Sequence, residues 1–298
     1  MIKFRGIAWS VHPLFVLVML ASVLTGYFAE LMTLFTLVLV HEIGHLLAAR
    51  SFGWTVREVK LLPFGGVVEA DESGSAPAAE EAAVAIAGPL QNIWMGALAW
   101  LFGYWGWWEE DWSAYIVQAN ALLVAFNLLP IYPLDGGRLL QSAISLGIPY
   151  HRTMVWTFRI GLMLSLAMVV YAVLPPFHPE GTAGVQLNLL MIGLFLLLSN
   201  WTYRRNMPYL FIRFLMRRDR VAVRRIAGGS LARPIVVTEG QPVSSVVRLL
   251  LREQYHLIYV MGERERIMNV MPERRLVAGY LNDSRPHRAI SELFTDAR

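Results

Sequence analysis

The sequence of 298 residues contains no cysteine. Disulfides, cysteine-ligated zinc, iron–sulfur clusters and thiol nucleophiles are therefore excluded, and any metal site has to use His, Asp, Glu or backbone oxygen ligands. The chain is also poor in charge, because only 16% of its residues are charged, whereas a soluble globular protein has about 25%. With 56% hydrophobic residues and a mean hydropathy of +0.46, this composition argues against a soluble cytosolic enzyme and against a disordered chain.

Apolar runs of the kind that cross a bilayer, which takes about 20 residues, recur along the first two thirds of the chain. We predict six spans, at residues 13–25, 31–49, 82–102, 115–129, 154–174 and 185–201. Loops that contain Lys or Arg alternate with loops at 26–30, 103–113 and 175–184 that contain neither. By the positive-inside rule, this alternation places both termini in the cytoplasm. The expected fold is a polytopic α-helical membrane protein.

Charge is distributed unevenly between two parts of the chain. Residues 1–203 hold 8 Lys and Arg against 13 Asp and Glu, whereas residues 204–298 hold 18 against 9. We therefore divide the chain into a six-span domain at 1–203, a basic amphipathic linker at 204–224 and a cytoplasmic domain at 225–298. The linker is expected either to lie on the inner leaflet or to be a packed helix. Beside membrane spans, the basic tail favours an anionic lipid surface over nucleic acid.

The last domain is predicted to be a small α/β module outside the membrane. It has short β-like runs at 234–237, 256–261 and 275–280 around a helical stretch at 243–254.

Ionisable residues stand inside the second apolar run, which contains the sequence HEIGH at 41–45. Such residues are costly within a membrane and usually carry function. On a helix, His41 and His45 lie four residues apart on one face and can place two imidazole nitrogens on one zinc ion, with Glu42 near enough to reach a metal-bound water. The alternative is a pair of structural polar residues that hydrogen-bond between helices.

A catalytic zinc site needs a third protein ligand. Asp135 is the best candidate, because it ends an apolar run where Pro130 and Pro133 break the helix and where Gly136 and Gly137 permit close backbone approach. The alternative is an ordinary surface turn, which we would prefer if the HEIGH sequence were absent.

Two further features concern the surroundings of this site. The segment 59–69, with the bend residues Pro63, Phe64, Gly65 and Gly66, predicts a membrane-dipping hairpin whose edge pairs with an extended substrate; the alternative is a plain cytoplasmic loop. Asn92 lies within the third span. It either hydrogen-bonds the helix of the ligands or simply joins two helices.

Three motifs together resemble the site-2 protease family of intramembrane zinc metalloproteases: HEIGH at 41–45, Gly-Pro-x-x-Asn at 88–92, and Asn-x-x-Pro-x-x-Pro-Leu-Asp-Gly at 127–136. The LLPFGG sequence at 61–66, the six spans and a C-terminal module similar to a single CBS domain narrow the resemblance further. They indicate the group of this family that processes pro-sigma-K in endospore-forming bacteria.

The resemblance implies a set of roles and partners. One Zn²⁺ would be bound by His41, His45 and Asp135, Glu42 would be the catalytic acid and base, and Asn127 would hold the substrate peptide. ATP would regulate cleavage through the CBS-like domain, although the sequence at 279–284 departs from the usual nucleotide signature, so we name no ATP contact. The expected partners are a membrane-associated precursor such as pro-sigma-K, membrane-bound inhibitor proteins of the sporulation programme, the lipid bilayer and a second copy of the chain, and no nucleic acid. The expected location is the membrane around the forespore, with both termini in the mother-cell cytoplasm.

The predicted function is therefore cleavage of a membrane-associated precursor by zinc-activated water. The competing prediction is an ion-coupled transporter regulated by a CBS-like module, in which the same four ionisable residues form an ion path. The spacing of His41, Glu42 and His45 favours the protease, because it suits a metal with an adjacent base.

Overall fold

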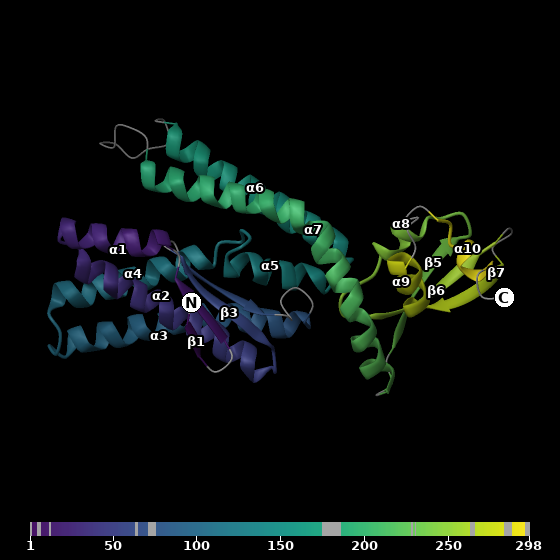
Figure 1. The fold of residues 1–298 in the computed structure, drawn as a ribbon, viewed down its shortest axis with the longest axis horizontal. Coiled ribbons are helices and arrows are strands. Elements are labelled where there is room, and N and C mark those ends of the chain that lie inside the picture. Colours follow the sequence, from purple (N-terminus) through teal and green to yellow (C-terminus); the bar gives the residue numbers. More distant parts are fainter. Residues whose placement is uncertain are drawn as a thin grey trace. The chain divides into compact units, whose positions relative to one another are not determined.

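The computed structural model describes residues 2–4, 7–11, 13–62, 65–70, 76–174, 186–227, 229, 231–262, 266–282 and 288–295 (Figure 1). Its contacts divide the chain into a first unit, residues 1–140, and a second unit, residues 141–298. Each unit contains its own helices and its own β-sheet.

The helices of the first unit coincide with the first four apolar runs of the sequence. They are α1 (Pro13–Thr25), α2 (Phe28–Ser51), α3 (Ala78–Tyr104) and α4 (Glu110–Asn127). Helix α3 packs against both α2 and α4 (Figure 1). Gly44 allows α2 and α3 to approach closely, because a Cβ atom there would lie 2.6 Å from the carbonyl oxygen of Ala87.

A four-stranded sheet accompanies these helices. Its strands are β1 (Ile2–Phe4), β2 (Ile7–Val11), β3 (Val56–Leu62) and β4 (Gly65–Ala70), in that spatial order. Strand β2 runs parallel to β3, and β3 pairs antiparallel with β4, with Leu62 opposite Gly65. The predicted hairpin at 59–69 is therefore present and the plain loop is wrong, while Pro63 and Phe64 fall outside the described residues.

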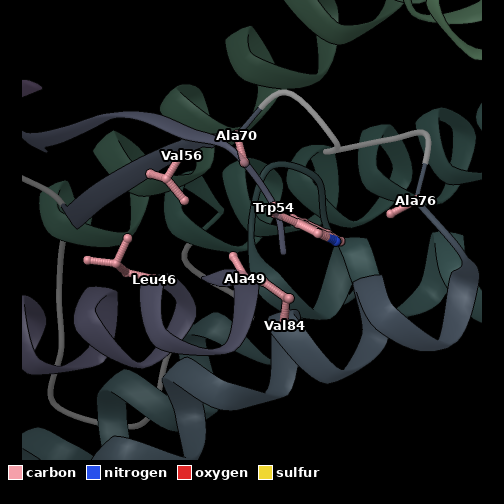
Figure 2. Close-up of a cluster of buried hydrophobic side chains, with 7 residues drawn as sticks. All are labelled: Leu46, Ala49, Trp54, Val56, Ala70, Ala76 and Val84. Atoms are coloured by element: carbon pink, nitrogen blue, oxygen red, sulfur yellow. The ribbon is translucent and has the colours of Figure 1, made fainter. Parts of the chain in front are cut away.

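A cluster of buried apolar side chains joins the base of this hairpin to the helices (Figure 2). It consists of Leu46, Ala49, Trp54, Val56, Ala70, Ala76 and Val84. These residues come from the end of α2, from β3 and β4, from α3, and from the connections just before β3 (Trp54) and α3 (Ala76), so their burial fixes the hairpin base against both helices. In addition, Nε1 of Trp54 donates a hydrogen bond of 2.9 Å to Oε2 of Glu80 in the first turn of α3.

The second unit contains the helices α6 (Tyr150–Val173) and α7 (Leu187–Ala227), which pack side by side (Figure 1). Helix α7 runs without interruption from the sixth apolar run through the predicted linker at 204–224. One side of this extension is buried, through Tyr203, Met207, Phe211, Phe214 and Leu215. Of the two alternatives for the linker, the packed helix is the one these contacts favour.

The C-terminal part of the second unit is an α/β module. Its elements are β5 (Ala232–Thr238), α8 (Val243–Val247), β6 (Tyr255–Met261), β7 (Ile267–Pro272), α9 (Glu273–Asn282) and α10 (Glu292–Thr295). Strand β6 is central, parallel to β5 and antiparallel to β7.

Two details of the module differ from the sequence prediction. The run at 275–280 is not a strand but part of α9, because Glu273, Leu276 and Val277 are buried at helical spacing. The expected helix at 243–254 is also shorter, since α8 ends at Val247.

Among the described residues, three helices are long and apolar enough to cross a membrane, judged by length and composition. They are α2, α3 and α6, which agrees with an integral membrane protein. Helix α1, with 13 residues, is short for a span, in line with the short first run of the sequence.

Candidate metal centre

Helix α2 carries His41, Glu42 and His45 in its last three turns, and all three side chains are buried. The apolar run keeps this segment helical, so the spacing of four residues puts both imidazoles on one face. The two rings meet edge to face with centroids 4.8 Å apart. Their Nε2 atoms are 3.1 Å from each other.

Asp135 reaches the same point from another part of the first unit. It is the first residue of α5 (Asp135–Ser145), after the loop that follows α4. The loop folds tightly over the start of α5, because a Cβ atom at Gly137 would lie 2.5 Å from the backbone nitrogen of Tyr132. This packing accounts for the two glycines that follow Asp135.

The carboxylate of Asp135 lies between the two imidazoles. Its Oδ2 atom is 3.1 Å from Nε2 of His41 and 3.1 Å from Nε2 of His45. The three residues are only 4%, 4% and 6% exposed. We call His41, His45 and Asp135 the ligand triad.

The ligand triad fits a zinc ion in both chemistry and spacing. Zinc binds His nitrogen and Asp oxygen at about 2.0–2.2 Å, so neighbouring ligand atoms of a tetrahedral ion are about 3.3 Å apart. The ligand atoms of the triad are separated by 3.1 Å. Two nitrogens and one carboxylate oxygen also leave the fourth position for water, as in catalytic zinc sites.

The other ring nitrogens of the two histidines are also bonded. Nδ1 of His45 lies 2.7 Å from the carbonyl oxygen of Val84 in α3, and Nδ1 of His41 lies 2.5 Å from Oδ1 of Asn92 in the same helix. Gly88 stands between these positions, and a Cβ atom there would collide with the imidazoles of both His41 and His45. Helix α3 therefore supplies the outer support of the ligand triad.

Glu42 follows His41 directly and is 7% exposed. Its carboxyl group interacts electrostatically with His41, His45, Asp135 and Arg138. This position is suited to a proton acceptor beside a metal ion.

The other predicted site residues that the structure describes, Asn127, Gly65 and Gly66, lie in other elements of the first unit. Asn127 is the last residue of α4 and is partly buried. Gly65 and Gly66 begin β4. Of the two alternatives for Asn92, the structure realises both, since it contacts His41 and also donates a hydrogen bond of 2.9 Å to Asn120 in α4. Sequence reasoning missed Asn120, although a buried amide inside an apolar run was a signal that could have found it.

Comparison with known proteins identifies relatives of this arrangement. The model of peptidase family M50 matches residues 29–108 and 105–168. Stage IV sporulation protein FB of Bacillus subtilis is 31% identical over 285 residues, which cover 95% of this chain and 94% of that protein. A zinc metalloprotease of Methanocaldococcus jannaschii is 29% identical over 184 residues, which cover 58% of this chain and 53% of that protein.

A solved structure shares the fold over about two thirds of this chain. The site-2 protease from Methanocaldococcus jannaschii superposes with a TM-score of 0.52 and 26% sequence identity, and the match covers 68% of this chain and 93% of that chain.

Proposed function

Because the chain belongs to peptidase family M50, the family of the site-2 proteases, we propose that this zinc metalloprotease cleaves a membrane-associated protein precursor at membrane depth. The observation that carries the proposal is the convergence of the ligand triad beside the buried Glu42. The relatives are zinc metalloproteases and a site-2 protease, so the comparisons favour the protease over an ion-coupled transporter.

Each residue of the centre has a distinct role in this proposal. Nε2 of His41, Nε2 of His45 and a carboxylate oxygen of Asp135 hold one Zn²⁺. When bound, zinc polarises the scissile carbonyl and lowers the pKa of a coordinated water. Glu42 accepts a proton from the attacking water and returns it to the departing amine nitrogen. Burial of Glu42 shields this proton transfer from bulk water.

The substrate has to be extended where it is cut, because the carbonyl groups of a helix are engaged in its own hydrogen bonds. Strand β4 lies at an edge of the sheet, and the hairpin base is packed in the same apolar cluster as Val84, whose carbonyl group bonds His45 (Figure 2). In the proposal, β4 pairs with the substrate from Gly65 and Gly66 onward, and Pro63 and Phe64 belong to the same substrate-binding segment. Asn127, at the end of α4, holds the substrate peptide.

The substrate class follows from the sporulation relative. At 31% identity over nearly the whole chain, Stage IV sporulation protein FB supports a membrane-associated precursor, and we assign a pro-sigma factor of the pro-sigma-K type. The proposed location is then the membrane around the forespore, with six spans and both termini in the mother-cell cytoplasm. Membrane-bound inhibitors of the sporulation programme and self-association belong to the same proposal.

The proposed domain division is 1–203 for the membrane protease, 204–224 for the linker and 225–298 for a CBS-like domain. The order of strands and helices from β5 to α9 supports one α/β repeat of this kind. ATP binding at this domain is the regulatory part of the proposal.

Co-expression of the full chain with pro-sigma-K tests this function. Glu42→Gln should retain zinc and lose cleavage by at least about 100-fold, because general acid–base catalysis contributes about 10²–10⁴-fold. Glu30→Gln is the matched control, since Glu30 lies in the first turn of the same helix. This variant should process the substrate normally.

Two results would overturn the proposal. If Glu42→Gln processes the substrate at the wild-type rate, Glu42 has no catalytic role. If the purified wild-type protein lacks stoichiometric zinc, or if cleavage continues in the presence of a zinc chelator, the reaction does not depend on zinc.

A further inference from the structure

A buried chain of amide groups leads from the ligand triad to α4. Nδ1 of His41 lies 2.5 Å from Oδ1 of Asn92, and Nδ2 of Asn92 donates a hydrogen bond of 2.9 Å to Oδ1 of Asn120. Nδ2 of Asn120 in turn donates a hydrogen bond of 2.9 Å to the carbonyl oxygen of Ile116. Asn92 and Asn120 are 0% and 1% exposed. We call these two residues the asparagine relay.

The direction of every hydrogen bond in the relay is set by its far end. The carbonyl oxygen of Ile116 can only accept, so Asn120 has to present its NH₂ group there and its oxygen to Asn92. Asn92 then has to present its NH₂ group to Asn120 and its oxygen to His41. Nδ1 of His41 must therefore donate, which leaves the lone pair on Nε2.

His45 also carries its proton on Nδ1, but it bonds a backbone carbonyl group directly. Nδ1 of His45 faces the carbonyl oxygen of Val84 directly, at 2.7 Å. A backbone carbonyl fixes this tautomer whatever the neighbouring side chains are. Only His41 depends on side chains for its orientation, because two amides separate it from the backbone acceptor.

The helix packing is adapted to the relay. Gly96 of α3 faces Asn120, and a Cβ atom at Gly96 would lie 3.3 Å from Cβ of Asn120. This is tighter than an ordinary side-chain contact, so a residue without a side chain allows α3 and α4 to approach at this level.

We propose that Asn92 and Asn120 are positioning residues that hold His41 with its proton on Nδ1 and its Nε2 lone pair directed at the metal. Helix α4 thereby takes part in the metal site without supplying a ligand. The inference rests on the proposed function, since it concerns the affinity of the ligand triad for zinc. Hydrogen-bond partners of ligating histidines typically change metal affinity by about 10–100-fold.

Zinc affinity of the purified full chain, measured by competition with a chelator, is the test. Asn92→Leu keeps the branching of the side chain at Cγ and removes the acceptor of His41, so zinc affinity should fall about 10–100-fold. Asn92→Asp retains an acceptor for His41 and should stay within a few-fold of the wild type. Asn120→Leu should cause a smaller loss of zinc affinity than Asn92→Leu. In this variant Asn92 remains next to His41, but its side-chain amide is free to rotate by 180° and exchange its oxygen and NH₂ group.

The double variant Asn92→Leu with Asn120→Leu separates a relay from two independent packing roles. In a relay, the second substitution adds nothing once Asn92 is lost, whereas independent effects multiply. Ser113→Ala is the matched control. Ser113 of α4 donates a buried hydrogen bond of 2.7 Å to Ala99 of α3, so this variant breaks a bond between the same two helices outside the relay and should leave zinc affinity unchanged.

The visible absorption of the protein loaded with Co²⁺ gives a readout that packing alone would not move. Loss of correct His41 orientation should alter the d–d bands of Asn92→Leu, and those of Ser113→Ala should match the wild type. Wild-type affinity in Asn92→Leu, or multiplied losses in the double variant, would overturn the relay. If Asn92→Leu does not fold, Asn120→Leu decides, and wild-type zinc affinity in that variant has the same consequence.

The same measurements distinguish failure of the proposed function from failure of the relay. A wild-type chain that binds no zinc refutes the metal centre before any variant is compared. Zinc in the wild type with no effect of the asparagine variants refutes only the relay.

Discussion

Each unit of the chain buries a histidine next to a carboxylate, and the two clusters differ in what balances their charge. In the first unit, the ligand triad directs two imidazole nitrogens and one carboxylate oxygen at a common point. In the second unit, His256 of β6 and Glu273 of α9 surround the guanidinium of Arg218, which comes from α7. We call the second group the arginine cluster.

The arginine cluster is complete by itself. Nε and Nη2 of Arg218 donate to the two oxygens of Glu273 at 2.9 and 2.8 Å, and Nη1 donates to the carbonyl oxygen of Leu251 at 2.5 Å. Nη2 also donates to the carbonyl oxygen of Gln254. His256 accepts a hydrogen bond from the amide of Leu251 and lies 3.1 Å from Glu273. The positive charge that balances Glu273 is thus supplied by the side chain of Arg218.

The comparison teaches how to distinguish a metal site from a structural ion pair. In the ligand triad, the nitrogens and the oxygen face one another at 3.1 Å, an arrangement that a shared cation stabilises. In the arginine cluster, each of the three guanidinium nitrogens donates to an acceptor, and the bidentate geometry ties the extension of α7 to the module. Similar residue types therefore form a candidate metal site in one unit and a structural ion pair in the other.

The largest expected effect comes from replacing Arg218, the cation of the arginine cluster. Arg218→Met should lower the free energy of unfolding of the C-terminal module by about 3–5 kcal/mol, because Glu273 is left buried without its partner. Hydrogen exchange of the β6 amides in the full chain measures this loss. Zinc content should stay at the wild-type level, since the ligand triad lies in the first unit.

Two variants sharpen this result. Arg205→Met, at an exposed arginine of the same helix, should change stability by less than about 0.5 kcal/mol. Arg218→Met combined with Glu273→Leu should recover much of the loss, because an apolar replacement removes the unpaired charge. Equal exchange rates in Arg218→Met and Arg205→Met would show that the arginine cluster does not hold the module together.

The next effect comes from exchanging a carboxylate for an amide in each cluster. Asp135→Asn should weaken zinc binding by about 100-fold or more, beyond the range of about 10–100-fold for residues that only support a ligand. Glu273→Gln is the matched change in the arginine cluster and should leave zinc affinity unchanged. Chelator competition on both proteins measures the contrast, and full zinc retention by Asp135→Asn would exclude Asp135 as a ligand.

The sequence was sufficient to group His41, His45 and Asp135 as candidate ligands because their signals are local. Two histidines at helical spacing in an apolar run, and an aspartate where prolines and glycines interrupt another run, predicted residues that the structure brings to within hydrogen-bond distance. The six apolar runs likewise coincide with helices, since length and hydropathy are properties of short segments.

The arginine cluster was not predictable in the same way. Arg218 is one of many basic residues in the stretch that follows the last apolar run, and its partners lie 38 and 55 residues further along the chain. Composition cannot tell which arginine turns inward when tertiary contacts decide it. The strand prediction at 275–280 failed for a related reason, because Leu276 and Val277 face the module from a helix that Glu273 begins.

The smallest expected effect is a pH dependence confined to the arginine cluster. Burial lowers the pKa of His256 from 6.5, so this ring stays neutral in the folded module where the unfolded chain already binds a proton. Burial alone would raise the pKa of Glu273, but hydrogen bonds from His256 and Arg218 lower it below 4.5. Both shifts mean that the unfolded state takes up more protons on acidification, so stability falls with decreasing pH.

The two groups act in different pH windows, which makes the assignment testable. The stability that neutral His256 provides is complete above its unfolded pKa of 6.5 and declines below it, by at most about 1.4 kcal/mol per pH unit, whereas the contribution of Glu273 declines only below 4.5. Exchange of the β6 amides, corrected for intrinsic rates, should reveal the first window in the wild type and lose it in His256→Gln. The same slope in both proteins would mean that another group titrates there. The arginine cluster would then be balanced by its guanidinium alone, and His256 would serve the module through packing and its bond from Leu251.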